Sequence, residues 1–487
     1  MRILFLDLDT LRPDHLGCYG YHRDTSPNID SIADEGVTFT NYYTPNAPCL
    51  PSRAALISGK FGILNGVVNH GGSTADMDKQ GADRDFISEI GSEALGCMLR
   101  NAGFRTVSIS PFGERHSAFW FYSGFNEIYN TGKGGMESAE EITPVVMDWL
   151  DRNADEDNWF LHINYWDPHG PYRAPDEFGN PFANEPLPDW ITEEAIEKQE
   201  QKTGPHSMKD IHMFNDDPWP GYPRYPGKIS GVEGARIMMD GYDCGIKYMD
   251  GHIGGIVQIL KDRGIWDDTA VIVTSDHGEN MGELGIWGEH ATADQITPKI
   301  PMIIKWPGMQ KGTFDDGLHY NLDLAPTIAE LLGQERMPSW VGDSYKPVLE
   351  SGKDCGRSEL ILEQCAHVCQ RSVRFDDWLY IRTYHDGYHL FPEEMLFNVK
   401  DDPYEQYDIA VERPEICKEA AWRLLNWHGE MMMLRKDAQD PLWITMREGG
   451  PYHARGHLKN YIKHLEKTGR IDGLEELKRR HPEELKD

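Results

Sequence analysis

The chain has 487 residues and a formal net charge of −32 at pH 7, and 39% of its residues are hydrophobic. This length is enough for one large domain with a full hydrophobic core and a smaller second domain. The negative charge disfavours nucleic acid as a partner, because nucleic-acid binding needs clustered positive charge. No segment approaches the roughly 20 apolar residues of a membrane span, so we expect no membrane partner.

The cysteines and the first residues predict where the protein resides. The eight cysteines have no paired spacing, which is typical of reduced thiols. The chain does not open on a basic segment followed by a long apolar core. We therefore expect no signal peptide and a cytoplasmic location.

Acidic residues follow the first predicted strand. Residues 3–8 form a short, mostly apolar run that predicts a buried strand, and the run ends in Asp7-Leu8-Asp9-Thr10. Since successive side chains of a strand point to opposite faces, Asp7 and Asp9 share a face. Two carboxylates in one place favour a bound cation. The alternative is that each is an ordinary turn or helix-cap aspartate.

Residues 49–53, with the sequence CLPSR, form the most specific motif in the chain. The motif places a cysteine and an arginine on either side of a proline-stiffened turn. Cys49 is a candidate nucleophile precursor, and Arg53 is a candidate fixed cation. The alternative for Cys49 is a buried structural thiol, which is the usual fate of a free cysteine.

Strands and helices alternate along the rest of the first 305 residues. Further strands are predicted at residues 105–110, 159–164, 269–274 and 301–305, with helices at 93–102, 138–152 and 242–262. This alternation predicts a mostly parallel α/β sheet, in which ligands bind beyond the carboxyl ends of the strands. Three of these strands lead into Arg115 and His116, His169, and Asp276 and His277. Asp9, Asp276 and His277 together form a candidate metal site.

Several stretches of the chain resemble the sulfatase family of the alkaline phosphatase superfamily. They are, in order, LDLDTLRPDHLGCYGY, the CLPSR motif, DPHGPY, SDHGE, PMIIKWPG, LDLAPTIAELLG and MLFNVKDDPYEQYDIA, within residues 1–410. The resemblance implies an α/β, alkaline phosphatase-like fold with a large, mostly parallel mixed sheet between helices. We expect a catalytic domain at residues 1–365, with an insertion at 174–230, and a small antiparallel sheet with a helical tail at 366–487.

The resemblance also implies the chemistry of the site. It implies that a formylglycine-generating enzyme oxidises Cys49 to formylglycine, whose hydrated gem-diol is the nucleophile. It further implies a metal, with calcium as first choice and manganese or magnesium as runner-up, held by Asp9, Asp276, His277 and the modified Cys49. Oxygen ligands with one imidazole suit such a hard cation.

The chain departs from the usual family pattern at three places. Asp9 is followed by a threonine where many sulfatases have a second aspartate, so Asp7 is predicted as a substitute metal ligand. The lysine that often follows the Asp-His strand is missing, and His290 is predicted to contact the sulfate instead. Arg115 is the predicted substrate-binding cation, and Lys305 is a further candidate cation for the pocket.

These residues support a nucleophilic displacement at sulfur. Arg53 and the metal favour ionisation of one diol hydroxyl. His169 and His290 are candidate acids for the leaving alcohol, and His116 is the candidate base that later helps expel sulfate. The chain has 20 histidines, so an isolated histidine is an ordinary loop residue by default. Position beyond strand ends is what singles out these three.

The sequence thus predicts a sulfuric ester hydrolase that acts on a small sulfated carbohydrate, a mono- or oligosaccharide. A small substrate is favoured because the negative charge of the protein repels a long sulfated polymer. A phosphonate monoester or phosphodiester hydrolase with the same nucleophile is one alternative, and a non-catalytic binding relative is another.

Two segments outside the conserved-looking core are placed to shape the pocket. Residues 174–230 are rich in proline, tryptophan and tyrosine, and we expect them to wall the pocket or to make a subunit contact in a homo-oligomer. Residues 450–455 in the C-terminal part are candidates to reach the pocket, with solvated surface as the alternative.

Overall fold

A large mixed sheet forms the centre of the protein. The computed structural model describes residues 1–79 and 88–486, and within them an eight-stranded sheet has the order β12-β2-β11-β8-β1-β7-β5-β6. These strands are β1 (Arg2–Leu8), β2 (Val37–Phe39), β5 (Arg105–Ile109), β6 (Glu127–Tyr129), β7 (Trp159–Tyr165), β8 (Thr269–Thr274), β11 (Met302–Lys305) and β12 (Thr313–Asp315). Strand β1 pairs in parallel with β7 and β8, whereas β11 runs antiparallel to β8 and β2. The predicted mostly parallel sheet is confirmed.

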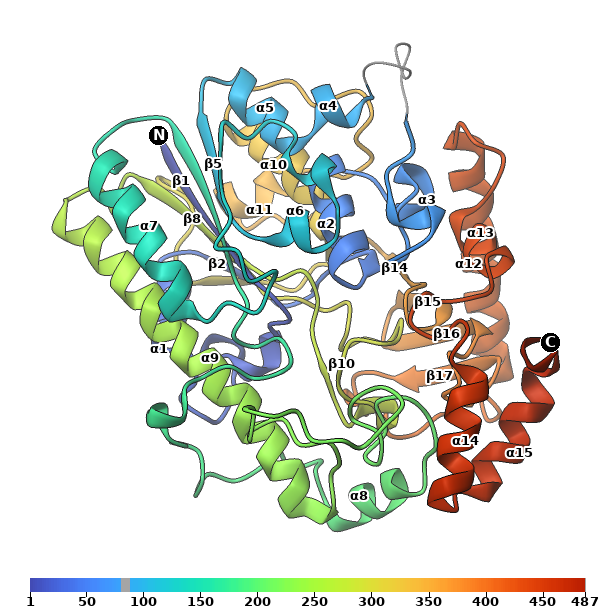
Figure 1. Cartoon of the computed structure of the whole chain (residues 1–487). Coiled ribbons are helices and arrows are strands. Elements are labelled where there is room, and N and C mark those ends of the chain that lie inside the picture. The colour runs from blue at the N-terminus through green and yellow to red at the C-terminus, as the bar shows by residue number, and fades with distance from the viewer. Residues whose placement is uncertain (80–87, 487) are drawn as a thin grey trace.

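Helices cover both faces of the sheet (Figure 1). Along β1, Leu4 and Leu6 pack in a core with α1 (Pro27–Ala33), α7 (Ala139–Asn153) and α9 (Gly231–Asp262). Ile3 and Phe5 face the opposite side and pack with α5 (Leu95–Asn101), α10 (Leu324–Leu331) and α11 (Lys346–Ser351). The two-residue alternation of β1 therefore fills two separate cores, as expected for a strand buried on both sides.

The predicted helices are present, with two changes of bounds. The helix expected at residues 242–262 begins earlier, at Gly231. The helix expected at 93–102 is divided into α4 (Ile90–Glu93) and α5, because Ala94 has an extended backbone with ψ of 153°. The helix α7 begins with a capping box between Ser138 and Glu141, which satisfies the free N–H groups of its first turn.

A second, smaller sheet lies beside the catalytic end of the first. Its order is β17-β16-β15-β14-β4, with β4 (Asn46–Ala47), β14 (Glu359–Gln364), β15 (Cys369–Phe375), β16 (Trp378–His385) and β17 (Glu394–Asn398). All neighbours are antiparallel except β14 and β4. Strand β4 ends two residues before Cys49, and Asn46 Nδ2 donates to Glu363 Oε2 at 2.7 Å. The smaller sheet is therefore joined directly to the segment that carries the CLPSR motif.

Helices close the C-terminal part of the chain. They are α12 (Pro414–Leu434), α13 (Pro441–Arg447), α14 (Leu458–Thr468) and α15 (Ile471–Arg480). The remaining short elements are α2 (Cys49–Ser58), α3 (Gly62–Asn65), α6 (Phe112–Arg115), α8 (Glu193–Glu200), β3 (Tyr42–Tyr43), β9 (Asn280–Met281), β10 (Trp287–Glu289) and β13 (His319–Tyr320). Across the described part of the chain, the search for a helix with the length and apolar character of a membrane span found none.

Candidate active site

The carboxyl ends of β1 and β8 meet the first turn of α2. Because β1 and β8 are parallel neighbours, with Asp7 opposite Thr274, both strands deliver their terminal acids to the same edge. Thr10 has a left-handed backbone with φ of 65°, and its N–H donates to Asp276 Oδ1 at 3.0 Å. Ser52 Oγ donates to the backbone oxygen of Asp276 at 2.6 Å, which fixes α2 against the end of β8. Cys49 and Arg53 are thereby held one helical turn apart at this edge.

Arg53 is the centre of a buried cluster of carboxylates. Its guanidinium lies 2.8 Å from Asp7, 2.9 Å from Asp9 and 2.6 Å from Asp276. Burial disfavours the charge of Asp9, but Arg53 outweighs burial and lowers the pKa of that carboxyl below its usual range. Burial, together with repulsion from Asp9 and Asp7, raises the pKa of Asp276 to about 7 in spite of Arg53. One guanidinium does not balance three carboxylates, so the site favours an additional cation.

Four side chains are close enough to share that cation. Among the described residues, ligand atoms of Asp9, Cys49, Asp276 and His277 all lie within 4.8 Å of one another. Cys49 Sγ is 3.0 Å from His277 Nε2, and His277 Nδ1 donates to the backbone oxygen of Gly278 at 2.9 Å. The proton on Nδ1 leaves Nε2 free to bind a metal. The donor set fits the expected hard metal.

Asp7 lies outside this ligand group. Both of its oxygens accept hydrogen bonds from Arg53, and one of them lies 3.2 Å from His162 Nε2. Asp7 and Asp9 do share a face of β1, as the two-residue period predicts, since Arg53 contacts both. The contacts of Asp7 are those of a residue that orients Arg53, and its predicted role as a metal ligand stays a prediction.

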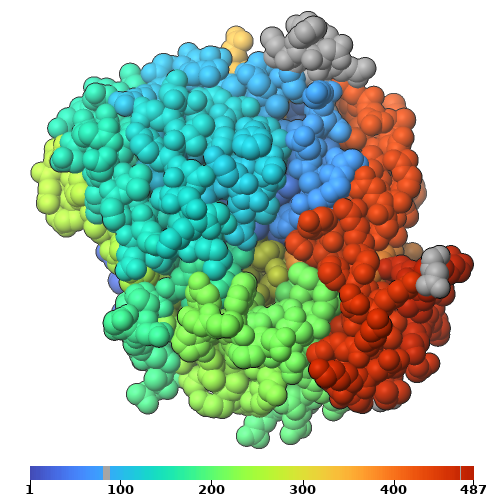
Figure 2. All heavy atoms as spheres, viewed as in Figure 1, coloured from blue at the N-terminus to red at the C-terminus, as the bar shows by residue number. Residues whose placement is uncertain are grey.

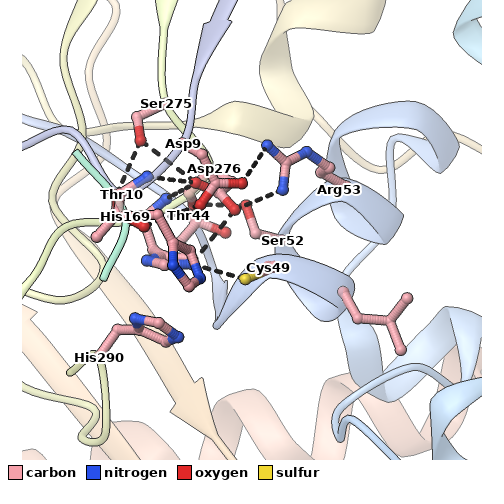
Figure 3. Close-up of polar contacts among 12 residues, drawn as sticks. Asp9, Thr10, Thr44, Cys49, Ser52, Arg53, His169, Ser275, Asp276 and His290 are labelled. Atoms are coloured by element: carbon pink, nitrogen blue, oxygen red, sulfur yellow. Dashed lines mark hydrogen bonds and ion pairs between the residues drawn. The ribbon is translucent and has the colours of Figure 1, made fainter. Parts of the chain in front are cut away.

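His290 is an imidazolium held by two glutamates. Its Nε2 donates to Glu289 at 2.9 Å, its Nδ1 lies 3.3 Å from Glu279, and its ring is 4.0 Å from that of His277. Burial lowers the pKa of His290, but Glu289 and Glu279 more than reverse this, and the pKa is well above its usual value. Burial raises the pKa of Glu279 to about 7, so Glu289 carries more of the charge. In the view of Figure 3, His290 and Arg53 lie on opposite sides of Cys49.

His169 and His116 are neutral, in contrast to His290. Burial lowers the pKa of each to about 3, and Arg115 adds to the shift. His169 Nδ1 donates to the backbone oxygen of Gly170 at 2.6 Å, and its ring lies 5.7 Å from the ring of His290. His116 Nε2 is buried and has no hydrogen-bond partner within the described chain. The two imidazoles are therefore suited to accept a proton near neutral pH, whereas His290 is suited to donate one.

A cavity of about 490 Å³ opens beside these histidines. Arg115, His169, Glu279 and His290 line it on one side, and residues of the 174–230 insertion, Trp219 and Tyr225 among them, line it on the other. The surface in Figure 2 is hollowed where the teal, green and red segments meet. Arg115 is held over the Trp166 ring at 5.1 Å. The insertion forms a wall of the pocket, as one of its two predicted roles requires.

Comparison with known families decides the identity of this site. The family described as Sulfatase matches residues 2–334, which is more than half of the chain. The chain belongs to the sulfatase family. Membership makes it a sulfuric ester hydrolase with the alkaline phosphatase-like fold, and the non-catalytic binding relative is set aside.

The sulfatase is distantly similar to several known proteins. Choline-sulfatase of Rhizobium meliloti is 24% identical over 511 aligned positions, covering 93% of each chain. A protein crystallised with its substrate D-glucosamine-2-N,6-O-disulfate is 20% identical with a TM-score of 0.71, covering 90% of this chain and 99% of that one. The phosphonate monoester hydrolase of Agrobacterium radiobacter is 20% identical with a TM-score of 0.69, covering 88% and 96%. At these identities the structural likenesses show the fold alone.

The prediction that Lys305 serves the pocket of this sulfatase is wrong. Lys305 is the last residue of β11, and because β11 runs antiparallel to β8, its carboxyl end lies at the opposite edge of the sheet. There the Lys305 ammonium donates to the backbone oxygens of Trp266 and Thr269, at the start of β8. Sequence periodicity identified the strand but carries no information on its direction.

Four histidines of the sulfatase site have no strand-end position that marks them in the sequence. They are His70, His206, His367 and His453. His70 Nδ1 lies 3.0 Å from His453 Nε2, and the ring of His453 stacks on that of His367 at 4.3 Å. His453 belongs to the segment 450–455 that was expected to reach the pocket, whereas the others occur in loops without a recognisable motif.

Proposed function

We propose that this sulfatase removes sulfate from a small sulfated carbohydrate, with a formylglycine at position 49 and a bound calcium ion. The observation that carries the proposal is the position of Cys49. Its sulfur lies among Asp9, Asp276 and His277, and a ring nitrogen of His290 is also within 4.8 Å of it. A reacting group at position 49 is thus between a cation site and a proton donor.

The unmodified thiol is poorly suited to be the nucleophile. Burial raises the pKa of Cys49 to about 12, and the carboxylates of Asp9 and Asp276 add to the rise. A thiol with this pKa holds its proton at neutral pH, and the thiolate is the reactive form. Formylglycine, once hydrated, would supply an attacking hydroxyl in place of the thiol.

Asp9, Asp276, His277 and the modified residue 49 would hold the metal. Oxygen ligands make calcium the first choice, with manganese or magnesium as runner-up. A bound divalent ion supplies positive charge that favours ionisation of a hydroxyl and offsets the negative charge of the sulfate oxygens. Arg53 holds the ligating carboxylates in place, since it contacts both Asp9 and Asp276.

The histidines divide the proton transfers between them. His290 is protonated and donates to the bridging oxygen or to a sulfate oxygen, so the leaving alcohol departs neutral. His116 and His169 are neutral and accept a proton when the sulfate is expelled. Arg115 lies at the cavity wall and is placed to pair with the sulfate. These assignments keep the roles predicted for His116 and Arg115, and they favour His290 over His169 as the acid.

The cavity favours a small carbohydrate. Its volume of about 490 Å³ lies in the range of roughly 300–1,000 Å³ that is usual for small-molecule sites. Trp219, which is 45% exposed, offers a flat apolar face on which a sugar ring can stack. Arg115 is the only arginine or lysine among the described lining residues, and Asp217, Glu279 and Glu289 also line the cavity. One cation among carboxylates favours a substrate with a single sulfate over a polyanion.

A phosphonate monoester hydrolase is the second candidate, supported by the structural likeness to the enzyme of Agrobacterium radiobacter. The two candidates are separated by assaying 4-nitrophenyl sulfate and 4-nitrophenyl phenylphosphonate with calcium present, followed by release of sulfate from glucosamine sulfates. We expect kcat/KM to be higher for the sulfate ester and inorganic sulfate to be released from the amino sugar. A higher kcat/KM for the phosphonate, without sulfate release from any sugar, would favour the second candidate.

A further inference from the structure

A second cluster of metal-ligating side chains lies beside the catalytic pocket. Among the described residues, ligand atoms of His206, Glu289 and His367 all lie within 4.8 Å of one another. His206 comes from the 174–230 insertion, Glu289 is the last residue of β10, and His367 lies in the turn between β14 and β15. His206 and His367 are buried, and the Glu289 side chain is 15% exposed. Three distant segments therefore bring two imidazoles and a carboxylate together.

The distances in this cluster match the edges of a tetrahedral metal site. His206 Nε2 lies 3.4 Å from Glu289 Oε2, and His367 Nε2 lies 3.7 Å from Glu289 Oε1. Zinc bonds to nitrogen and oxygen ligands of about 2.0–2.2 Å, arranged tetrahedrally, place neighbouring ligand atoms about 3.3–3.6 Å apart. Only small side-chain movements are needed for an ion to sit between the three groups.

The hydrogen bonding of His206 is that of a metal ligand. Its Nδ1 donates to the backbone oxygen of Ile211 at 2.9 Å, so the proton is on Nδ1 and Nε2 presents a lone pair. Within the described chain, Nε2 is buried and has no hydrogen-bond partner. A backbone oxygen that orients the ring from behind is the usual support of a zinc-binding histidine. The partner of this nitrogen is the part that the structure leaves open.

His367 is also held in a fixed orientation. Its ring stacks on that of His453 at 4.3 Å, and the backbone N–H of His453 donates to the backbone oxygen of Ala366 at 2.9 Å. His367 Nε2 faces Glu289 from the side of the smaller sheet. The cluster therefore has two oriented imidazoles on either side of one carboxylate.

We propose that His206, Glu289 and His367 bind a second metal ion, a zinc ion or a similar transition-metal cation, separate from the catalytic site. Two imidazoles and one carboxylate favour zinc, whereas the oxygen-rich set around Asp9 favours calcium. His206 and Glu289 both line the cavity, so the fourth position of the ion is open to it. The ion would tie the insertion to both sheets and fix Glu289, the residue that holds the imidazolium of His290. The proposal does not depend on which ester is hydrolysed.

The test is the number and kind of metal ions per chain. Protein stripped with a chelator is reloaded with calcium and zinc, desalted, and analysed by inductively coupled plasma mass spectrometry. We expect one calcium and one zinc per chain in the parent, and calcium alone in His206→Gln and in His367→Gln. His212→Gln is the matched control, because His212 belongs to the same insertion and lines the same cavity but stacks on Tyr225 outside the cluster. It should keep the zinc.

Two further measurements guard against unfolding and against zinc in the catalytic site. The calcium equivalent retained by His206→Gln reports that the catalytic end is folded. In an Asp9→Asn/Cys49→Ala background, cobalt should still give the intense visible absorption of a tetrahedral ion, and the added His206→Gln change should abolish it. The proposal is overturned if the parent binds no zinc, or if a folded His206→Gln or His367→Gln protein binds it as the parent does.

Discussion

Replacement of His290 by alanine and by lysine tests the proton donor of the site. In the structure, both ring nitrogens of His290 face carboxylates, Glu289 at 2.9 Å and Glu279 at 3.3 Å, and its ring lies 4.0 Å from that of His277. The imidazolium is thus stabilised in front of the reacting position. His290→Ala removes the donor, whereas His290→Lys keeps a cation at the same place.

The size of the effect follows from one charge-assisted hydrogen bond. Such a bond contributes about 1.5–3 kcal/mol, which corresponds to a loss of roughly ten- to 150-fold in kcat/KM for His290→Ala. The pH dependence follows from the sign of the pKa shift. Glu289 and Glu279 raise the pKa of His290 in spite of burial, so the imidazolium persists above its ordinary titration range. Activity should therefore stay high through neutral pH and fall only as pH rises through this raised pKa.

The assay is kcat/KM against pH on one sulfate ester, for the parent, His290→Ala, His290→Lys and Glu279→Gln. Glu279→Gln removes a carboxylate that is only partly ionised near pH 7, so it should move the alkaline limb to lower pH by about one unit. His290→Lys should move that limb to higher pH. An alanine variant with the rate and the alkaline limb of the parent would refute the role of His290.

Three further predictions concern the metal, the carboxylate cluster and the pocket wall. Asp9→Asn and Asp276→Asn should lose calcium and activity together, while Asp7→Asn should keep its calcium; metal analysis distinguishes these outcomes, and loss of calcium from Asp7→Asn would instead make Asp7 a ligand. Arg53→Met leaves three buried carboxylates without their cation, so the free energy of unfolding should fall by about 3–5 kcal/mol in denaturant titrations, and an unchanged value would contradict the cluster's charge balance. Trp219→Ala should raise KM for a sugar sulfate up to about tenfold with kcat nearly unchanged, because a stacking contact contributes about 0.5–1.5 kcal/mol; an unchanged KM would exclude stacking.

The central fold was predictable because its strands are buried on both faces. Such strands appear in the sequence as short apolar runs, and β8 and α12 have the predicted bounds. The direction of β11 was not predictable, since an apolar run has the same appearance in either direction, and the error over Lys305 followed from it. The break at Ala94 depends on backbone angles that helical spacing does not encode.

The catalytic site was predictable only where its residues follow strands. Asp9, Asp276 and His277 meet because parallel strands end at one edge, and their spacing along the chain reveals this. His206 and His367 come from a long insertion and a hairpin turn, and their approach to Glu289 is set by tertiary packing. Nothing in the local sequence around them indicates this convergence.

Mass spectrometry of residue 49 in active protein tests the central claim most directly. Trypsin should release residues 24–53 as one peptide, because no lysine or arginine lies between Asp24 and Ser52, and Cys49 is its only cysteine. The protein is produced with and without a co-expressed formylglycine-generating enzyme, and sulfatase activity is compared with the fraction of the peptide that carries the aldehyde or its hydrate. We predict that activity rises in proportion to this fraction and that Cys49→Ala is inactive. Full activity in protein that carries only the unmodified thiol would contradict the account.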